Sequence, residues 1–366
     1  MRETGKATVL TLDAGGTNFV FSAIRDFKEV TTPVRLPANA DDLDKCLGNV
    51  VSGFEQVARA VGSFDAISFA FPGPADYDLG IIGNLPNFKA FNGDVPLGPM
   101  LKEHFGVPVF INNDGNLFAS GVALAGYLPK LNERLRKAGS KKQFRNLIGI
   151  TLGTGIGCGI VLDGKMIMGD NSCGAEIHNT LNPFQTRWNA EESVSTRAIQ
   201  RVYAQRAELE VNSALMPRDI YDIAHGVKPG SKSAALDAFT EYGKALGGTV
   251  ANVLTLIDGL VVIGGGLSAA WSLFSSAMFA ELNRDFENSH GERSSRLSFK
   301  VFDLEDPTVF ETFARGETRR LVIPGTQKTI DFDGLARTGI ARSDIDGSYA
   351  ISLGAYALAL QKLEEK

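Results

Sequence analysis

Residues 148–170, IGITLGTGIGCGIVLDGKMIMGD, carry the pattern from which the fold can be inferred. The stretch begins as an apolar run, breaks into a glycine-rich turn at 153–157, and resumes with apolar residues at 160–162. This order predicts a strand, a tight turn and a second strand. Glycine at alternate positions of the turn leaves the backbone amides open, so an anion can approach them closely.

The turn matches neither of the common phosphate-binding loops. The chain contains no GxxxxGK[ST] sequence, and Cys158 stands where the last glycine of a GxGxxG pattern would fall. Gly153, Thr154 and Gly155 are therefore candidate anion-binding residues in a turn of another kind. An ordinary hairpin with bulges is the alternative interpretation of this stretch taken alone.

A similar arrangement occurs near the start of the chain, at residues 8–24, TVLTLDAGGTNFVFSAI. An apolar strand ends in Asp13, a Gly/Thr turn follows at 14–18, and a second strand is expected at 19–24. Such a repeat suggests two similar lobes. Asp13 is a candidate for holding Mg²⁺ through water, since this ion usually takes one or two carboxylates and keeps several waters. A turn-capping aspartate is the alternative.

Two further strand ends carry polar side chains. Proline ends the short strand expected at 66–71, and the long loop after it contains Asn87. The strand expected at 109–111 is followed by Asn113 and Asp114, and a helix is expected at 117–125. A carboxylate at this junction is well placed as a general base, although an aspartate near a helix N-terminus is also favourable for stability alone.

The last third of the chain contains another turn suited to a ligand. A strand at 260–263 is followed by three glycines, which include Gly265 and Gly266, and then by a helix from about 269 to 286, so helix amides face the turn. Short strands with glycine turns are expected over 295–340. The segments 126–146 and 303–333 receive no role.

Composition limits the classes of function. The chain has 366 residues, enough for two domains, and a net charge of −5, which gives no reason to expect nucleic-acid binding. Its three cysteines are unevenly spaced and suggest reduced thiols in a cytoplasmic protein. No apolar run approaches the roughly 20 residues that span a bilayer, and the charged N-terminus does not resemble a signal peptide.

The pair DAGGTN and LGTGIG resembles the two phosphate segments of the actin-like sugar kinase and ATPase superfamily, and from Val9 to about Leu360 the chain is similar to the ROK family (repressor, open reading frame, kinase). The resemblance implies an α/β fold of two actin-like, ribonuclease H-like lobes with a cleft between them. The N-terminal lobe would comprise residues 1–120, with the last helix, 348–366, packing back on it. The C-terminal lobe would comprise 121–347.

The resemblance also implies roles for individual residues. Asp114 and Asn113 match an ND-x-N motif, in which the aspartate removes the proton from the attacking hydroxyl and the asparagine binds sugar. Sugar ligands would further be Asn87, Glu176 and Glu191, together with either His178 or Asn179, since His178 stands one residue short of the family histidine. ATP and Mg²⁺ would be held by Asp13, Gly15, Gly16, Thr17 and Asn18, by Gly153, Thr154 and Gly155, and by Gly265 and Gly266.

The zinc-binding cysteine cluster of the family is missing. Only Cys173 and His178 lie in the matching region, which is too few for a four-ligand zinc site. We therefore expect no structural zinc.

The function implied is that of an ATP-dependent hexose kinase similar to glucokinase, acting on the 6-hydroxyl. Two alternatives are a sugar-responsive transcriptional regulator, which would need a DNA-binding domain before the sheet that starts by Thr8, and an actin-like ATPase that is not a kinase. The sequence does not name the hexose, and it is compatible with a homodimer.

Overall fold

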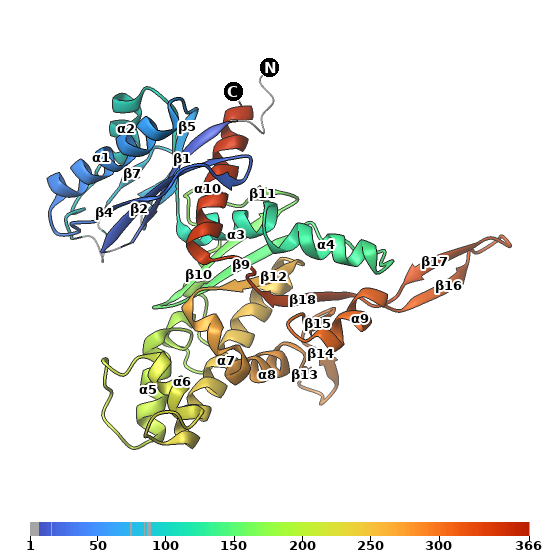
Figure 1. Ribbon diagram of the computed structural model, residues 1–366. Coiled ribbons are helices and arrows are strands. Elements are labelled where there is room, and N and C mark those ends of the chain that lie inside the picture. The colour runs from blue at the N-terminus through green and yellow to red at the C-terminus, as the bar shows by residue number, and fades with distance from the viewer. Residues whose placement is uncertain (1–6, 16, 74, 84, 86–88, 366) are drawn as a thin grey trace. The chain divides into compact units, whose positions relative to one another are not determined.

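The computed structural model describes residues 7–15, 17–73, 75–83, 85 and 89–365. The chain divides into two compact units (Figure 1). Unit 1 contains Met1–Pro129, Gly159–Ala175 and Asp344–Lys366, and unit 2 contains Lys130–Cys158 and Glu176–Ser343. Sheets and helices alternate along the chain, so the predicted α/β class is confirmed.

Unit 1 is built on a six-stranded sheet with the order β3-β2-β1-β5-β8, in which β4 also pairs with β2. Its strands are β1 (Thr8–Ala14), β2 (Asn18–Arg25), β3 (Lys28–Glu29), β4 (Val34–Pro37), β5 (Ala66–Ala70) and β8 (Val109–Asn112). The antiparallel pair β1–β2 is the strand, turn and strand expected from the sequence. Strands β1, β5 and β8 run parallel, so their carboxyl ends meet at one edge, where α/β proteins place their sites.

Helices cover both faces of this sheet (Figure 1). They are α1 (Leu43–Val61), α2 (Leu97–Phe105), α3 (Asp114–Leu124) and α10 (Gly347–Glu364). Side chains of β1 alternate between the faces: Leu10 and Leu12 pack in a phenylalanine-rich core with α1, whereas Val9 packs against α10. A small ribbon of β6 (Ala75–Asp76) and β7 (Ile81–Ile82) completes the unit.

Helices α3 and α10 approach so closely that their backbones touch. A Cβ atom on Gly121 would lie 1.9 Å from the carbonyl oxygen of Ala350. One on Gly354 would lie 1.8 Å from the carbonyl oxygen of Leu117. Glycine is therefore required at both positions, and the contact fixes the helix that begins at Asp114.

The second large sheet has the order β11-β10-β9-β12-β18-β15. Its strands are β9 (Leu147–Leu152), β10 (Ile156–Leu162), β11 (Lys165–Met166), β12 (Leu260–Gly264), β15 (Lys300–Asp303) and β18 (Arg337–Arg342). Strand β12 runs parallel to β9 and to β18. The turn between β9 and β10 is the glycine-rich turn of the sequence analysis.

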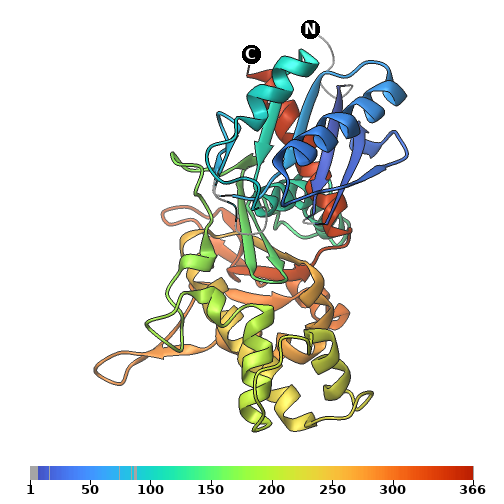
Figure 2. The ribbon, with the colours of Figure 1, turned by 90° about the vertical axis from the view of Figure 1, so that its left-hand side faces the viewer.

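Most helices of unit 2 gather into one group, in which α5, α6 and α7 pack together (Figure 2). The helices are α5 (Thr196–Arg206), α6 (Pro217–Ala224), α7 (Lys232–Leu256), α8 (Trp271–Leu282) and α9 (Pro307–Arg315), and α4 (Tyr127–Lys137) begins in unit 1 and ends in unit 2. Short 3₁₀ turns form at Ile177–Asn179, Ala190–Glu192 and Gly266–Ala270. No helix within the described ranges is both long and apolar enough to cross a membrane.

The expectation of strands throughout 295–340 is wrong in part. Helix α9 forms inside this segment because Asp306 caps its N-terminus and Pro307 occupies the first turn, while Phe313 and Ala314 are buried on one face. Hairpins do flank it: β13 (Asp285–Glu287) pairs with β14 (Arg293–Ser295), and β16 (Thr318–Val322) pairs with β17 (Thr329–Asp333). The second hairpin extends away from the rest of unit 2 (Figure 1).

Candidate active site

The first Gly/Thr turn presents an accessible carboxylate and open backbone. Asp13, at the end of β1, is half-buried, and Gly15, Thr17 and Asn18 are exposed. A Cβ atom on Gly15 would lie 3.0 Å from the carbonyl oxygen of Asn18, so the turn is tight. Two predicted residues, Gly16 in this turn and Asn87 in the long loop, lie outside the described residues.

Asp114 is the first residue of α3, directly after β8. The N-cap is Asn113, whose Oδ1 accepts a hydrogen bond from Asn116 N at 2.7 Å. Asp114 is therefore not the N-cap of α3. This weakens the interpretation that its carboxylate serves only to stabilise the helix N-terminus. Because Oδ1 of Asn113 is used, its Nδ2 is the group suited to a ligand, as a donor.

The surroundings of Asp114 favour proton transfer. The side chain is exposed to solvent, yet enough protein lies around it that desolvation raises its pKa, and the nearby carboxylate of Asp13 raises the pKa further. The hydrogen bond from Gly115 N to Oδ1, at 2.8 Å, acts in the opposite direction. A carboxylate with a raised pKa is a stronger base than an ordinary aspartate.

The second Gly/Thr turn is closed by a hydrogen bond from Gly153 N to Gly155 O at 3.0 Å. The carboxylate of Glu191 lies on this turn: Ile156 N donates to Glu191 Oε2 at 3.3 Å. A Cβ atom on Gly155 would lie 2.0 Å from the same oxygen. Thr196 joins α5 to the turn, because its N and its Oγ1 donate to Gly153 O at 3.2 and 3.0 Å.

An arginine links Glu191 to its neighbour Glu192. Arg197 donates through Nη2 to Glu192 Oε1 at 2.7 Å and to Glu191 Oε1 at 3.1 Å. The hydrogen bond from Arg197 lowers the pKa of Glu192, so this carboxylate is ionised at neutral pH. Glu191 thus binds Arg197 through one oxygen and the second Gly/Thr turn, Gly153–Ile156, through the other.

Glu176 and His178 form a pair, with 2.8 Å between Glu176 Oε2 and His178 Nδ1. Their side chains are 36% and 31% exposed, so a ligand can reach both. Asn179 is also exposed and follows in the same 3₁₀ turn. Of the two candidates for the family histidine, His178 is therefore the one placed in direct contact with Glu176 by this ion pair.

A buried asparagine organises the next loop, and sequence reasoning missed it. Asn182, which is 2% exposed, accepts hydrogen bonds through Oδ1 from Phe184 N and Gln185 N. Its Nδ2 donates to Asn189 O and to Ser193 Oγ, both at 2.9 Å. The Asn-Pro pair at 182–183, typical of turns, was the available signal. Within the described ranges, no three His, Cys, Asp or Glu side chains are arranged to hold a metal ion.

Gly266, the second glycine after β12, borders a cavity of about 160 Å³. Gly265 has φ 85°, and a Cβ atom there would lie 2.3 Å from Leu152 O, so the position requires glycine. The cavity is lined by Pro217, Arg218, Tyr221, Phe239, Gly266, Leu267, Ala269 and Ala270. Sequence analysis identified Gly266 but not the residues from α6.

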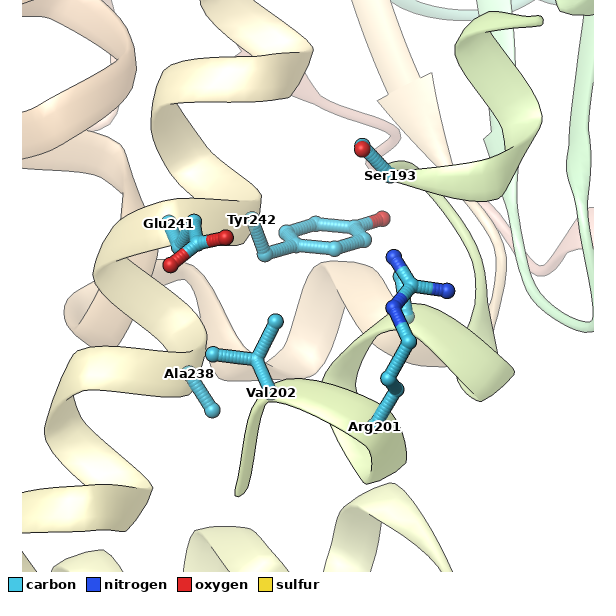
Figure 3. A pocket seen from close by; sticks show the side chains of 7 residues that line it. Ser193, Arg201, Val202, Ala238, Glu241 and Tyr242 are labelled. Atoms are coloured by element: carbon cyan, nitrogen blue, oxygen red, sulfur yellow. The ribbon is translucent and has the colours of Figure 1, made fainter. Parts of the chain in front are cut away.

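A second cavity in unit 2 is far smaller, about 10 Å³, which is near the minimum for one water molecule (Figure 3). The hydroxyl of Tyr242 on α7 points toward Ser193 and Arg201 across this space. No described residue hydrogen-bonds that hydroxyl, and burial raises its pKa. The cavity is too small for a sugar or a nucleotide.

The two compact units, each containing a β-sheet with a Gly/Thr turn, have the α/β architecture of the two-lobed actin-like class. The chain matches the ROK family over residues 9–296 and belongs to that family. The glucokinase of Parabacteroides distasonis, known from a crystal structure, is 48% identical in sequence to this chain. The structural match covers 99% of each of the two chains, with a TM-score of 0.87.

Relatives include both kinases and a regulator. Glucokinase of Thermotoga maritima is 26% identical over 292 residues, which cover 72% of this chain and 84% of that protein. The DNA-binding transcriptional repressor Mlc of Escherichia coli is 24% identical over 266 residues, which cover 69% of this chain and 62% of the repressor.

Proposed function

We propose that this chain transfers the γ-phosphoryl group of ATP to the 6-hydroxyl of a hexose, with Asp114 as the general base. The observation that carries the proposal is the environment of Asp114: a solvent-exposed carboxylate at the β8–α3 junction, not used as a cap, with a raised pKa. The names of the kinase relatives support the same reaction.

Nucleotide binding is assigned to the three glycine-containing turns. The turn at 14–18 and the turn at 153–156 offer amides to phosphate oxygens, and the cavity beside Gly266 takes the adenosine. Asp13, half-buried at a strand end, fits a magnesium ion held mainly through water. When bound, Mg²⁺ supplies positive charge that offsets the phosphate charge in transfer.

Sugar binding is assigned to Asn113, Glu176 and Glu191, and to His178 with Asn179 as its alternative. Asn87, which lies outside the described residues, is a sugar ligand by the family resemblance alone. Carboxylates accept hydrogen bonds from sugar hydroxyls that are about twice as strong as those of neutral acceptors. The Nδ2 of Asn113 provides a donor next to the base. Asp114 then takes the proton of the attacking hydroxyl as that oxygen bonds to the γ-phosphorus and ADP leaves.

The competing functions are a sugar-responsive regulator, which the similarity to the DNA-binding transcriptional repressor Mlc supports, and an actin-like ATPase without sugar transfer. The discriminating experiment is a coupled ADP-release assay with glucose, mannose, N-acetylglucosamine and fructose, with Asp114→Asn as the control. We expect at least one hexose to raise ADP release far above the sugar-free rate, and the 6-deoxy form of that hexose to fail. Equal rates with and without every sugar would refute the proposal.

A further inference from the structure

The loop 180–189 separates two segments of unit 2 to which sugar binding is assigned. Glu176 and His178 lie at the 3₁₀ turn that precedes the loop, and Glu191 lies in the 3₁₀ turn that follows it. Each turn is joined directly to one end of the loop. The conformation of the loop therefore helps to set the distance between the carboxylate of Glu191 and the pair formed by Glu176 and His178.

Backbone contacts close the neck of the loop, where its two ends meet. Ala190 N donates to Thr180 O at 2.8 Å, and Leu181 and Asn189 form an antiparallel bridge. A hairpin of two strands is marginally stable at best in water, and a single bridge is weaker still. Closure of the neck therefore depends on contacts beyond these backbone pairs.

Asn182, which is 2% exposed, provides such contacts from inside the neck. Its Oδ1 accepts hydrogen bonds from Phe184 N at 3.0 Å and from Gln185 N at 3.1 Å, within the loop itself. Its Nδ2 donates to Asn189 O and to Ser193 Oγ, both at 2.9 Å, and these two bonds cross the neck. Two accepted and two donated bonds are the full capacity of a primary amide, so no hydrogen-bonding group of this side chain is left for a ligand.

The four bonds require a neutral amide at this position. An aspartate at 182 has the same shape and keeps both acceptor sites, but it has no donor for Asn189 O and places a buried carboxylate against that oxygen. The bond to Asn189, which crosses the neck, would be lost, while the bonds within the loop would remain. Alanine removes all four bonds. The two substitutions therefore separate closure of the neck from the local fold of the loop.

The far end of the loop packs on helix α5 and carries a natural reporter. The ring of Trp188 lies against the guanidinium of Arg201, with 4.6 Å between Cζ and the ring centroid. Nη1 of Arg201 also lies 3.7 Å from Oε2 of Glu192, the residue next to Glu191. Trp188 is 39% exposed, so the accessibility of its ring to a quencher reports whether the loop stays in place.

We propose that Asn182 is a positioning residue for the sugar site: its amide closes the neck of the loop and so holds Glu191 in a fixed place relative to the pair that precedes the loop. The inference rests on the proposed function, which assigns Glu191, Glu176 and His178 to the hexose. Ligand groups that are already held in place lose less conformational entropy on binding, so a closed neck raises the affinity for sugar. The effect is directed at the sugar, because the second Gly/Thr turn keeps its own bonds to Thr196.

The test compares Asn182→Ala and Asn182→Asp with a matched control in the same unit, Asn132→Ala. Asn132 binds a loop in a similar way: its Nδ2 donates to Phe144 O at 2.8 Å, and its Oδ1 accepts from Phe144 N at 2.9 Å. It belongs to a segment with no assigned role. ADP release is measured with whichever of glucose, mannose, N-acetylglucosamine and fructose gives the wild-type protein its highest kcat/KM.

Both substitutions of Asn182 should raise KM for the hexose by about tenfold, the loss expected when one hydrogen bond to a ligand is no longer made. KM for ATP should change by no more than about twofold, and Asn132→Ala should leave both constants within about twofold of the wild type.

A second readout does not depend on activity. Trp188 and Trp271 are the two tryptophans of the chain, so Trp271→Phe leaves the loop with the single indole fluorophore. In that background, acrylamide should quench Trp188 more strongly in Asn182→Ala than in the parent protein. Asn132→Ala should not change the quenching.

A hexose KM close to that of the wild type in either Asn182 variant would overturn the inference. An equal rise of KM for hexose and for ATP would also overturn it, because it would show a general structural role, and unchanged quenching would show that the amide does not hold the loop. Asn182→Asp keeps the test independent of whether the alanine variant folds. Failure of the proposed function is recognised separately, as an absence of hexose-dependent ADP release in the wild-type protein.

Discussion

At Gly354 on α10, one added methyl group should strongly lower the folding stability of unit 1. Its Cβ atom would lie 1.8 Å from Leu117 O, whereas ordinary contacts begin at 3.4 Å, so the helices would have to separate by 3.4 − 1.8, about 1.6 Å. The atoms met are backbone atoms of α3, and no side-chain rotation can relieve the collision.

The magnitude follows from two opposed effects. Overpacking of a well-packed core costs about 1–3 kcal/mol, and a rigid backbone contact belongs at the upper end. Alanine is about 1 kcal/mol better than glycine inside a helix, which offsets part of this cost. We expect Gly354→Ala to lower the free energy of unfolding by about 2 kcal/mol, and to lower Tm by about 4–8 °C for a body of this size.

The assay is thermal and urea unfolding followed by circular dichroism, with kcat measured in parallel because α3 carries Asp114 at its start. Gly48→Ala is the matched control: the same chemical change in α1, at an exposed position where no described atom lies within 4 Å. It should leave stability unchanged or raise it by up to about 1 kcal/mol. A Tm for Gly354→Ala at or above that of the wild type would refute the close contact between α3 and α10.

Five further outcomes are expected. Asp114→Asn should cut kcat by about 10²–10⁴ in the ADP-release assay; a variant that keeps a tenth of the activity would remove Asp114 as the base. The same change should raise the free energy of unfolding at pH 7 but not at low pH, because a raised pKa means that ionised Asp114 destabilises the fold progressively as pH rises through that pKa; urea unfolding at both pH values measures the difference. Tyr242→Phe should lower the free energy of unfolding, measured with urea, by about 1 kcal/mol if a water molecule in the adjacent small cavity hydrogen-bonds the hydroxyl. A higher free energy of unfolding would show that the hydroxyl has no hydrogen-bond partner. Gly153→Ala should leave Tm unchanged, since no described atom lies within 4 Å of its added Cβ, but should weaken AMP-PNP binding in calorimetry; unchanged binding would place the phosphates elsewhere. Activity should survive zinc chelation once Mg²⁺ is restored, and tightly bound zinc found by elemental analysis would contradict this.

The features that sequence predicted are those set by neighbouring residues. Strand, glycine turn and strand is a local pattern, and β1–β2 and β9–β10 both form where it occurs. The junction at Asp114 was also visible, because an apolar strand, a cap and a helix follow one another within a few residues. The interpretation of 295–340 as short strands with glycine turns missed the helix at 307–315, because the alternation around it obscured the local signal of Asp306 and Pro307.

Features set by distant residues could not be predicted. Glu191 reaches Ile156 across 35 positions of sequence, and nothing in either segment specifies that contact. Asn182 bonds four partners only after its loop has folded. The lining of the larger cavity from α6, which includes Arg218 and Tyr221, likewise depends on tertiary packing.

Glycine occupies these turns for two different reasons, which the sequence alone does not distinguish. Gly155 and Gly265 leave room for the protein itself, the first for the carboxylate of Glu191 and the second for Leu152 O. Gly153 and Gly266 meet no described atom within 4 Å, so their lack of a side chain opens space toward solvent rather than permitting a contact. A ligand that approaches these turns meets open space at the second pair, whereas Glu191 lies beside Gly155 and Leu152 O lies beside Gly265. Under the proposed function, Gly153 and Gly266 are therefore the turn glycines at which a phosphate oxygen can come nearest the backbone.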